Sequence, residues 1–390
     1  MTLKADLSQS DQNRLFEILG QGFGFAGERW GQWAALLGQE NLFGWYDGSH
    51  LVGGLGVYPM GQWFGGSAVG LVGIAGVGLA PAVRSRGAAK RMLQQTLKEL
   101  RQRGYALAGL YPATQNVYRH VGFEQAGEYV VQSAPFAHFR PRAAYDGEVT
   151  EVNTTNHAVF HDLYRRQAKQ QSGMLERGDA IWRRVVQPEG DNPVYGALFG
   201  PAHSPEGYVI YSQKRHDDGF DMLIRDYGIT TPQAARGLLQ YVSGFFSIGT
   251  RLTWKAPTRG GLNTLIREQA KVVTDFRWML RVLDPEKAFS ERGYNPTVAG
   301  AVSFQYTDDL FPEVSGSYQL QVKGGHGLLE RIDTSPSLQL TPRSLAALFS
   351  GYLSASDLML MEVATGSGDE ILQFTQITHN PEGVWCPDFF

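Results

Sequence analysis

Residues 77–90 read Val-Gly-Leu-Ala-Pro-Ala-Val-Arg-Ser-Arg-Gly-Ala-Ala-Lys and are the most informative segment of the chain. The apolar, glycine-rich run that ends at Leu79 predicts a strand, and a turn with two arginines follows. From Gly87 onward an apolar stripe that ends at Leu100 predicts one face of a helix, and Gly104 predicts its end. The first N–H groups of a helix lack partners and carry partial positive charge, so this junction is typical of a phosphate site.

The residue types in this turn fit such a site. Gly87, Ala88 and Ala89 are small enough to let backbone amides approach phosphate oxygens, and Arg84, Arg86 and Lys90 add positive charge. The alternative is an ordinary strand–helix joint with solvated arginines, which short patterns of this kind often are. The strand before the turn and the helix after it favour the phosphate site.

A second motif lies further along, in residues 116–123, Asn-Val-Tyr-Arg-His-Val-Gly-Phe. It predicts a short helix that leads into Gly122 and Phe123. Residues 84–89 are similar to the R/Q-x-x-G-x-G/A signature of the GNAT superfamily of N-acetyltransferases. Residues 116–123 resemble that family's second signature, a short helix that carries Asn and Tyr and closes with Gly-Phe. The resemblance implies a mixed-sheet domain that binds acetyl-CoA.

Composition excludes several other classes of protein. The 390 residues carry a formal net charge of −3, with 43% hydrophobic and 19% charged residues, which indicates a globular chain. This balance gives no electrostatic reason to expect a nucleic-acid or membrane partner. The single cysteine, Cys386, excludes an intrachain disulfide and a cysteine-rich metal site, and we expect no metal. Without a signal pattern or a stretch of about 20 apolar residues, the chain is expected to be soluble and cytoplasmic.

Three regions differ in pattern: residues 1–140, 141–285 and 286–390. The first two both alternate strands with helices, which suggests a duplicated architecture. In the second region Thr231 and Pro232 predict a helix start, with Thr as cap and Pro as first helical residue. In the third region Thr341 and Pro342 predict another, after alternating strands.

This layout resembles one branch of the superfamily, the enhanced-intracellular-survival (Eis) acetyltransferases. The resemblance extends to residues 278–284, 351–355 and 385–390, and covers essentially the whole chain. It implies an α+β chain of two GNAT-like mixed-sheet domains in tandem, the first catalytic and the second degenerate, followed by a sterol-carrier-protein-like α+β domain that ends in the active site. Residues 230–237 lack the basic glycine turn, so the second domain is expected to have lost the cofactor. The family also implies a homo-oligomer, a ring of six.

The resemblance places acetyl-CoA contacts on three segments. The end of the strand would offer amides to the pantetheine and thioester, the turn would hold the pyrophosphate, and residues 111–115 would line the acyl end. The positions carried over are Val77, Gly78, Leu79, Ser85, Arg86, Gly87, Ala88, Ala89, Lys90, Ala113 and Thr114. Residues 111–115 depart from the family's usual run.

Two groups are candidates for the proton transfers. Tyr118 would protonate the departing thiolate; a core aromatic before Gly-Phe is the alternative. The resemblance assigns the base to the α-carboxylate of Phe390. A free α-carboxyl has a pKa of about 3.3–3.7, and burial beside Trp385 and Phe389 would raise it. Most chain ends are frayed, but this one is too apolar to be left in water.

Other residues have open or ordinary interpretations. Glu28, Trp30 and Trp33 either line an acceptor pocket, where a carboxylate and indole faces suit a cationic amine, or form an amphipathic helix. Cys386 is expected to serve packing, and His120 and His157 are expected at helix surfaces.

Taken together, these motifs predict an acetyl-CoA-dependent N-acetyltransferase. It would transfer the acetyl group directly to a primary amine of a small molecule or peptide, in a ternary complex. The alternative is a non-catalytic acyl-CoA-sensing or lipid-binding protein that uses the C-terminal domain.

Overall fold

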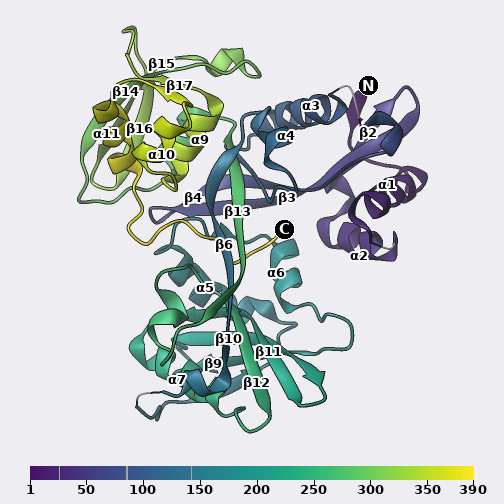
Figure 1. The fold of residues 1–390 in the computed structure, drawn as a ribbon, viewed down its shortest axis with the longest axis vertical. Coiled ribbons are helices and arrows are strands. Elements are labelled where there is room, and N and C mark those ends of the chain that lie inside the picture. The colour runs from purple at the N-terminus through teal and green to yellow at the C-terminus, as the bar shows by residue number, and fades with distance from the viewer. Residues whose placement is uncertain (26, 85–86, 142) are drawn as a thin grey trace. The chain divides into compact units, whose positions relative to one another are not determined.

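The computed structural model describes residues 1–25, 27–84, 87–141 and 143–390. The chain divides into two compact units (Figure 1). The first contains Met1–Gly127, Arg277–Pro381 and Phe390, and the second contains Glu128–Phe276 and Glu382–Phe389. No helix in the described parts of the chain is long and apolar enough to cross a membrane.

The first unit begins with a mixed sheet flanked by helices. Its sheet has the order β1-β2-β3-β4-β5-β13, in which only the β4–β5 pair is parallel. The elements are β1 (Thr2–Lys4), α1 (Gln9–Phe23), α2 (Gly27–Leu37), β2 (Leu42–Asp47), β3 (His50–Phe64), β4 (Ser67–Leu79), α3 (Ala88–Gln102), β5 (Leu107–Leu110), α4 (Gln115–Arg119) and β13 (Lys271–Val282).

The sequence pattern is confirmed in these elements. The apolar stripe of α3 is buried from Met92 to Leu100, and Gly104 follows the helix with φ +85°, a conformation that glycine adopts at little cost. The strand predicted before the turn is β4, and the short helix predicted at residues 116–120 is α4.

The second unit repeats this arrangement. Its sheet has the order β7-β9-β10-β11-β12-β6, and again only one pair, β11–β12, is parallel. The elements are β6 (Glu124–Pro135), β7 (Val149–Val152), α5 (His161–Ala168), β8 (Leu175–Glu176), α6 (Asp179–Val186), β9 (Val194–Phe199), β10 (Gly207–His216), β11 (Gly219–Ile229), α7 (Pro232–Ser243) and β12 (Gly249–Lys255).

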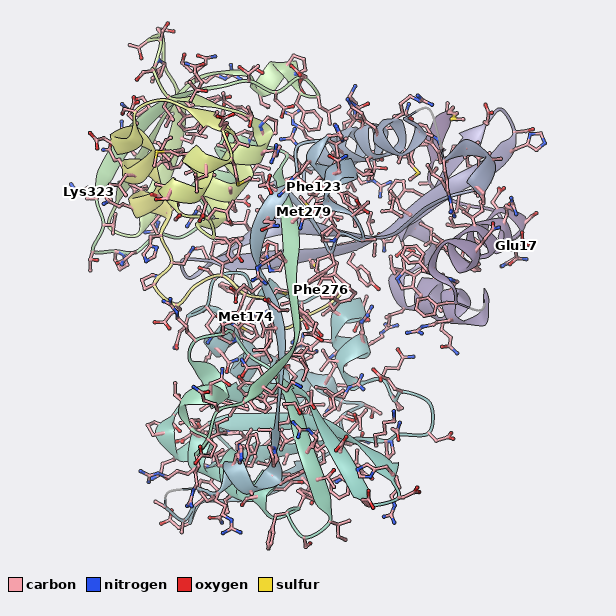
Figure 2. The ribbon with its side chains drawn as sticks, in the orientation of Figure 1. Glu17, Phe123, Met174, Phe276, Met279 and Lys323 are labelled. Carbon is pink, nitrogen blue, oxygen red and sulfur yellow. The ribbon has the colours of Figure 1, made fainter. Side chains whose placement is uncertain are left out.

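The two sheets therefore match strand for strand, and α7 connects β11 to β12 as α3 connects β4 to β5. This confirms the predicted duplication at the level of topology. The last strand of each sheet comes from the segment of chain that follows the other domain. β6 follows α4 of the first domain but pairs with β12, and β13 follows the second domain but pairs with β5, where Met279 lies opposite Leu110 (Figure 2).

The third domain completes the first unit. Its five-stranded sheet has the order β16-β15-β14-β17-β18 and packs against helices (Figure 1). The elements are α8 (Pro285–Glu291), β14 (Gly300–Tyr306), β15 (Gly316–Lys323), β16 (His326–Arg331), β17 (Gln339–Leu340), α9 (Pro342–Ser350), α10 (Ala355–Leu360), β18 (Ala364–Thr365) and α11 (Gly368–Thr378). Thr341 caps α9 as predicted. Aromatic rings fill its interior. The ring centroids of Phe289 and Phe349 are 5.1 Å apart, and those of Phe304 and Phe374 are 5.3 Å apart.

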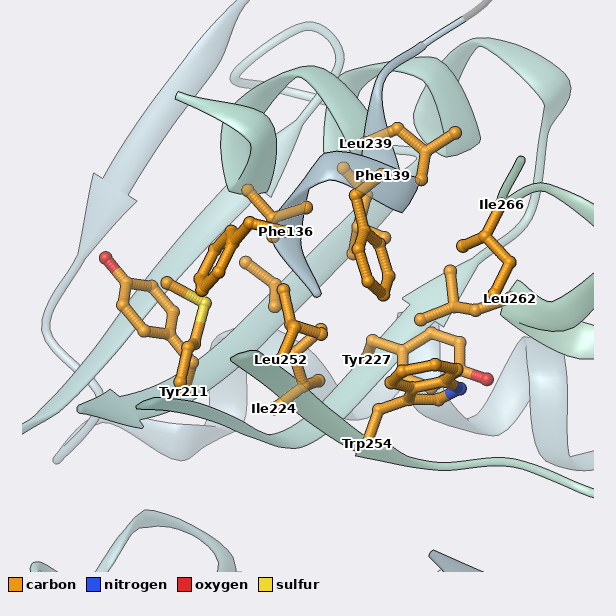
Figure 3. Close-up of a cluster of buried hydrophobic side chains, with 14 of the residues drawn as sticks. Phe136, Phe139, Tyr211, Ile224, Tyr227, Leu239, Leu252, Trp254, Leu262 and Ile266 are labelled. Carbon is orange, nitrogen blue, oxygen red and sulfur yellow. The ribbon is translucent and has the colours of Figure 1, made fainter. Parts of the chain in front are cut away.

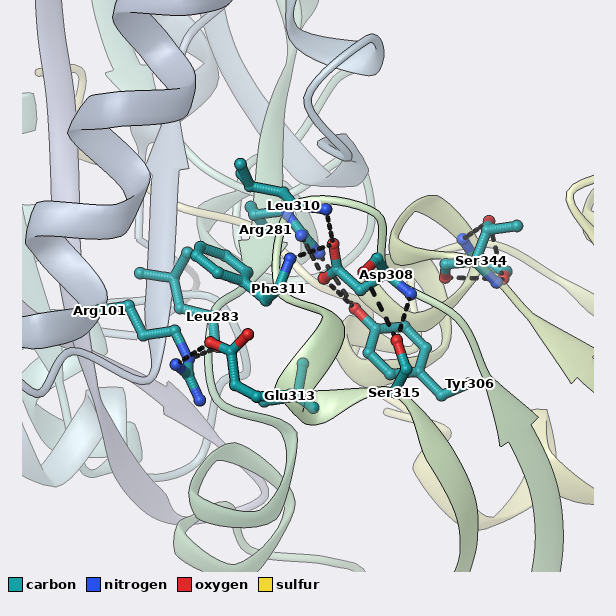
Figure 4. Close-up of polar contacts among 12 residues, drawn as sticks. Arg101, Arg281, Leu283, Tyr306, Asp308, Leu310, Phe311, Glu313, Ser315 and Ser344 are labelled. Carbon is teal, nitrogen blue, oxygen red and sulfur yellow. Dashed lines mark hydrogen bonds and ion pairs between the residues drawn. The ribbon is translucent and has the colours of Figure 1, made fainter.

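A buried ion pair joins the third domain to β13 (Figure 4). Arg281 pairs with Asp308, and both side chains are 1% exposed. The other oxygen of Asp308 accepts hydrogen bonds from the N–H groups of Leu310 and Phe311, and the Tyr306 hydroxyl donates to Asp308 at 2.8 Å. Each lone pair of this carboxylate thus has a donor nearby, and these hydrogen bonds offset the free-energy cost of removing the charge from water.

Asp308→Asn should destabilise the protein by about 3–5 kcal/mol, because it leaves Arg281 as a buried charge without a counter-ion. The free energy of unfolding in urea measures this loss. Asp309→Asn is the control, since Asp309 is the exposed neighbour and its replacement should change little. Equal stability of the two variants would contradict the assigned role of the ion pair.

Candidate active site

The centre of the first domain is the point where β4 and β5 separate. The two strands pair only at residues 71–73 and 107–109, whereas β4 continues to Leu79. A β-bulge in β4 includes Gly76, which has φ +60°, and bends the strand at this point. From residue 74 to 79 no strand in the described part of the chain pairs with the edge of β4 that faces β5. Residues 75–78 are half-buried, so part of this segment of β4 remains accessible.

Beyond this edge the chain enters the N terminus of α3. Gly87 precedes the helix with φ +72°, and no side chain caps it within the described residues. Among the described residues, a Cβ on Gly87 would meet only Arg91 Nη1, at 3.8 Å, so these residues leave space beside the Gly87 Cα. Arg84 closes the turn by donating from Nε to the carbonyl of Leu79 at 3.0 Å. Ser85 and Arg86 lie outside the described residues.

The first turn of α3 has the properties that the phosphate interpretation needs. Ala88 is buried, Ala89 is half-buried, and Lys90 is exposed. Small residues therefore face the sheet, while a cationic side chain stays in solvent beside unpartnered N–H groups. The residues present fit a pyrophosphate.

Tyr118 lies on α4, which follows β5. Its side chain is 8% exposed, and burial raises the pKa of its phenol to about 12. The ring packs edge-on against Phe123 at 6.1 Å, and the backbone carbonyl accepts from the N–H groups of Val121 and Phe123. Ala113 and Thr114 are exposed just before the helix. The phenol is thus fixed and neutral at physiological pH.

A buried carboxylate holds α4 in place. Glu124 is 0% exposed and binds Arg119 of α4 at 2.7 Å and Arg343 of α9 at 2.6 Å. Burial opposes its ionisation, but hydrogen bonds from both arginines and from the Gln125 N–H outweigh burial and lower the pKa of Glu124. The third domain therefore contributes directly to the position of the helix that carries Tyr118.

Phe390, the final residue, packs where β4 leaves β5. A Cβ on Gly73 would lie 2.6 Å from the Phe390 ring, so only glycine leaves room for it there. The ring meets Tyr111 edge-on at 5.3 Å and Tyr58 at 6.1 Å. Tyr111 begins the segment that leads to Tyr118. Phe390 is half-buried, against these tyrosines and the strand.

The residues before Phe390 are anchored within the second unit. The Trp385 N–H donates to the Ser172 carbonyl at 3.1 Å, and the Cys386 N–H donates to the Glu128 carbonyl at 2.8 Å. Asp388 accepts from Arg177 Nε at 2.9 Å, and both side chains are almost fully buried. Residues 384–388 are buried, which confirms the predicted burial of this segment, although Phe389 is 39% exposed. Cys386 is buried, in agreement with a packing role.

The candidate acceptor residues lie on α2. Trp30 is 8% exposed and belongs to the hydrophobic core of the first domain, where it meets Trp33 edge-on at 5.3 Å. Trp33 covers the bulge of β4, since a Cβ on Gly76 would lie 2.9 Å from its ring. The side chain of Glu28 is outside the described part of the structure. The acceptor pocket and the amphipathic helix both remain open interpretations of these residues.

The equivalent position in the second domain is built differently. β11 also outruns its partner and pairs with β12 only at residues 220–223. Aromatic side chains fill the core beside it, among them Phe139, Tyr227 and Trp254 (Figure 3). At the start of α7 the Thr231 side chain accepts from the Ala234 N–H, and its hydroxyl donates to the Glu206 carboxylate at 2.6 Å. The Thr231 cap and the Glu206 carboxylate thus lie at the start of α7, the position at which the phosphate interpretation places an anion on α3.

Several residues of the site were not predicted. The contacts of Tyr58, Tyr111 and Gly73 with the ring of Phe390 were not predicted, although Tyr111 belongs to the segment predicted to line the acyl end. A glycine inside a strand does mark a bulge or the close approach of another group, so Gly73 and Gly76 offered a usable signal. The contacts of the two tyrosines depend on tertiary structure.

Family models match all three domains. Residues 5–126 and residues 173–282 each match an acetyltransferase (GNAT) domain, and residues 285–387 match a sterol carrier protein domain. These matches agree with the two mixed sheets and the five-stranded third domain.

Whole-chain relatives point the same way. A GCN5-related N-acetyltransferase structure from Anabaena variabilis is 32% identical and superposes with a TM-score of 0.94, covering 100% of both chains. The N-acetyltransferase Eis of Mycobacterium tuberculosis is 24% identical over 73% of this chain and 72% of that protein. The structure of Eis1 from Mycobacterium abscessus shares the fold, with a TM-score of 0.82 at 17% identity over 100% of both chains.

The separated strands, the uncapped α3 and the order of the domains therefore have a common explanation. The chain is an acetyltransferase that belongs to the GCN5-related N-acetyltransferases, in their three-domain Eis-like branch.

Proposed function

We propose that the protein transfers the acetyl group of acetyl-CoA directly to a primary amine, within a complex that holds both substrates. One observation carries the proposal: β4 continues beyond its last pair with β5 and leads into the uncapped N terminus of α3. An open strand edge can hydrogen-bond the amide groups of pantetheine, and the helix N terminus can bind pyrophosphate.

Within this proposal the residues have separate roles. The backbone of residues 77–79 holds the pantetheine arm, and the N–H groups of Ala88, Ala89 and Lys90 hold the pyrophosphate. Tyr118 donates a hydrogen bond to the thiolate as the C–S bond breaks. Its pKa of about 12 exceeds the ordinary thiol value of about 8.5, so it stabilises developing charge more readily than it releases a full proton.

The nitrogen of the amine gives up two protons. The second leaves the attacking nitrogen as the C–S bond breaks, and it balances the charge of the thiolate so that CoA is released as a thiol; the first leaves before the attack. A lysine-like ammonium has a pKa of about 10.4 and must lose a proton before it attacks. The ring of Phe390 packs on Gly73, where β4 and β5 separate. The proposed base is the α-carboxylate of the same residue. It would accept the proton directly or through a water. The aromatic packing inside the third domain supports this enzymatic role over lipid carriage, because rings occupy the space between sheet and helices.

Gly87→Val should weaken acetyl-CoA binding at least about tenfold. A β-branched residue avoids φ +72° and would cover the helix N–H groups. Gly104→Val is a matched control, with φ +85° at the other end of the same helix and nothing within 4 Å of its Cβ. Calorimetric titration of both folded variants measures the affinity. If Gly87→Val binds as tightly as Gly104→Val, the pyrophosphate site is wrongly placed.

Tyr118→Phe should lower kcat by about 10²-fold or more while the affinity for acetyl-CoA stays nearly unchanged. Because burial raises the phenol pKa to about 12, the wild type should show no loss of activity from Tyr118 ionisation up to about pH 10. Steady-state rates from pH 6 to 10 test both points, with Tyr105→Phe as control. An unchanged kcat in Tyr118→Phe would assign this tyrosine to packing alone.

A Gly-Ser extension after Phe390 should lower turnover by about 10²-fold or more, because it replaces the carboxylate with an amide and displaces the chain end. Deletion of Phe390 should do the same, since it retracts the carboxylate by up to about 3.6 Å. Acetyl-CoA binding should persist in both. The same extension placed before the exposed Met1 is the control. Equal turnover of the two extended proteins would rule out the Phe390 carboxylate as the base.

A further inference from the structure

The second unit contains a cavity of about 200 Å³ with a cationic side and an aromatic side. Arg184, Arg225 and Lys255 supply the cations, and Tyr129 and Phe389 supply the rings, which meet edge-on at 5.6 Å. Aliphatic side chains of β6, α6 and β11 complete the lining. The acetyl transfer described above gives this cavity no role.

The ammonium of Lys255 lies in the cavity and has few hydrogen-bond partners among the described residues. Its ammonium carries three N–H donors, and among the described residues Nζ donates only to the Arg225 carbonyl, at 3.3 Å. No ion pair between described residues includes Lys255. Burial lowers the pKa of Lys255, which is the signature of a cation short of counter-charge. An anion in the cavity would supply it.

Arg225 adds a second charge that the protein matches poorly. Its Nε and Nη2 atoms donate to the backbone carbonyls of Val185 and Arg184, at 2.7 and 3.0 Å. Within the part of the chain that the structure describes, its buried Nη1 has no hydrogen-bond partner, and the Glu189 carboxylate that pairs with it at 3.5 Å belongs to a side chain that is 73% exposed. Neutral carbonyls thus fix the guanidinium without cancelling its charge.

The buried acid of the cavity is already engaged. Asp388 lines the same space, but it accepts from Arg177 at 2.9 Å, and Arg177 also pairs with Asp226. Counting these groups gives four cations (Arg177, Arg184, Arg225 and Lys255) against three carboxylates (Asp226, Asp388 and Glu189). The cavity therefore keeps a net positive charge around Lys255.

We propose that this cavity binds a small organic acid with an apolar body, through its carboxylate or phosphate group. Lys255 and Arg225 would face the acid, and Tyr129 and Phe389 would face the apolar body. The aromatic and aliphatic lining accommodates hydrocarbon, and the cations neutralise the acid.

The binding of the acid can be measured apart from catalysis. Sodium acetate and inorganic phosphate are titrated calorimetrically into the full-length protein at constant ionic strength. At least one should bind to the wild type, and Lys255→Met should weaken it about tenfold or more, the effect of losing a hydrogen-bonded charge. The tighter of the two probes identifies the acid. Lys214→Met, which removes an exposed lysine of β10 in the same unit, should bind like the wild type.

The outcomes separate the claims. Failure of both probes to bind the wild type, or equal binding by Lys255→Met, overturns the anion site. Lys255-dependent binding of either probe supports the anion site, whether or not the protein acetylates an amine, so failure of the proposed transfer is distinguished from failure of the site.

Discussion

The separation of β4 from β5 after Gly73 is the constraint on which the rest of the active-site architecture depends. Two parallel strands that part leave backbone donors and acceptors without ladder partners, and such an edge is costly unless something pairs with it. In this chain the bulge at Gly76 bends the strand, and the final residue packs at the point of divergence. In our proposal, the amide groups of acetyl-CoA pair with the strand edge beyond this point.

The second domain has the same topology, but side chains fill its core beside the corresponding strand, β11. β11 also outruns β12, but aromatic side chains such as Tyr227 and Trp254 occupy the core beside it. At the helix start, Thr231 in place of Gly87 brings its own cap, and Glu206 brings negative charge. Both changes oppose a pyrophosphate. In our proposal this half has exchanged cofactor binding for support: it anchors the last residues of the chain, and Arg177 holds Asp388 two positions before the end.

Much of this could be predicted from sequence because the signals are local. Strand β4, helix α3, the short helix with Tyr118, and the Thr-Pro helix starts at residues 231 and 341 each depend on neighbours in the chain, and all these elements formed as predicted. The exchange of β6 and β13 could not be predicted, because strand pairing over such separations is decided by packing. The same is true of the Arg281–Asp308 pair and of the cationic cavity.

The central claim is that each chain binds one acetyl-CoA, on β4 and the N terminus of α3. Calorimetric titration of the full-length protein with acetyl-CoA tests it most directly, because the two sheets share a topology but only the first keeps an uncapped glycine turn. We predict one site per chain. Two equivalent sites per chain would contradict the account, since the second domain would then have kept its cofactor, and so would the absence of binding.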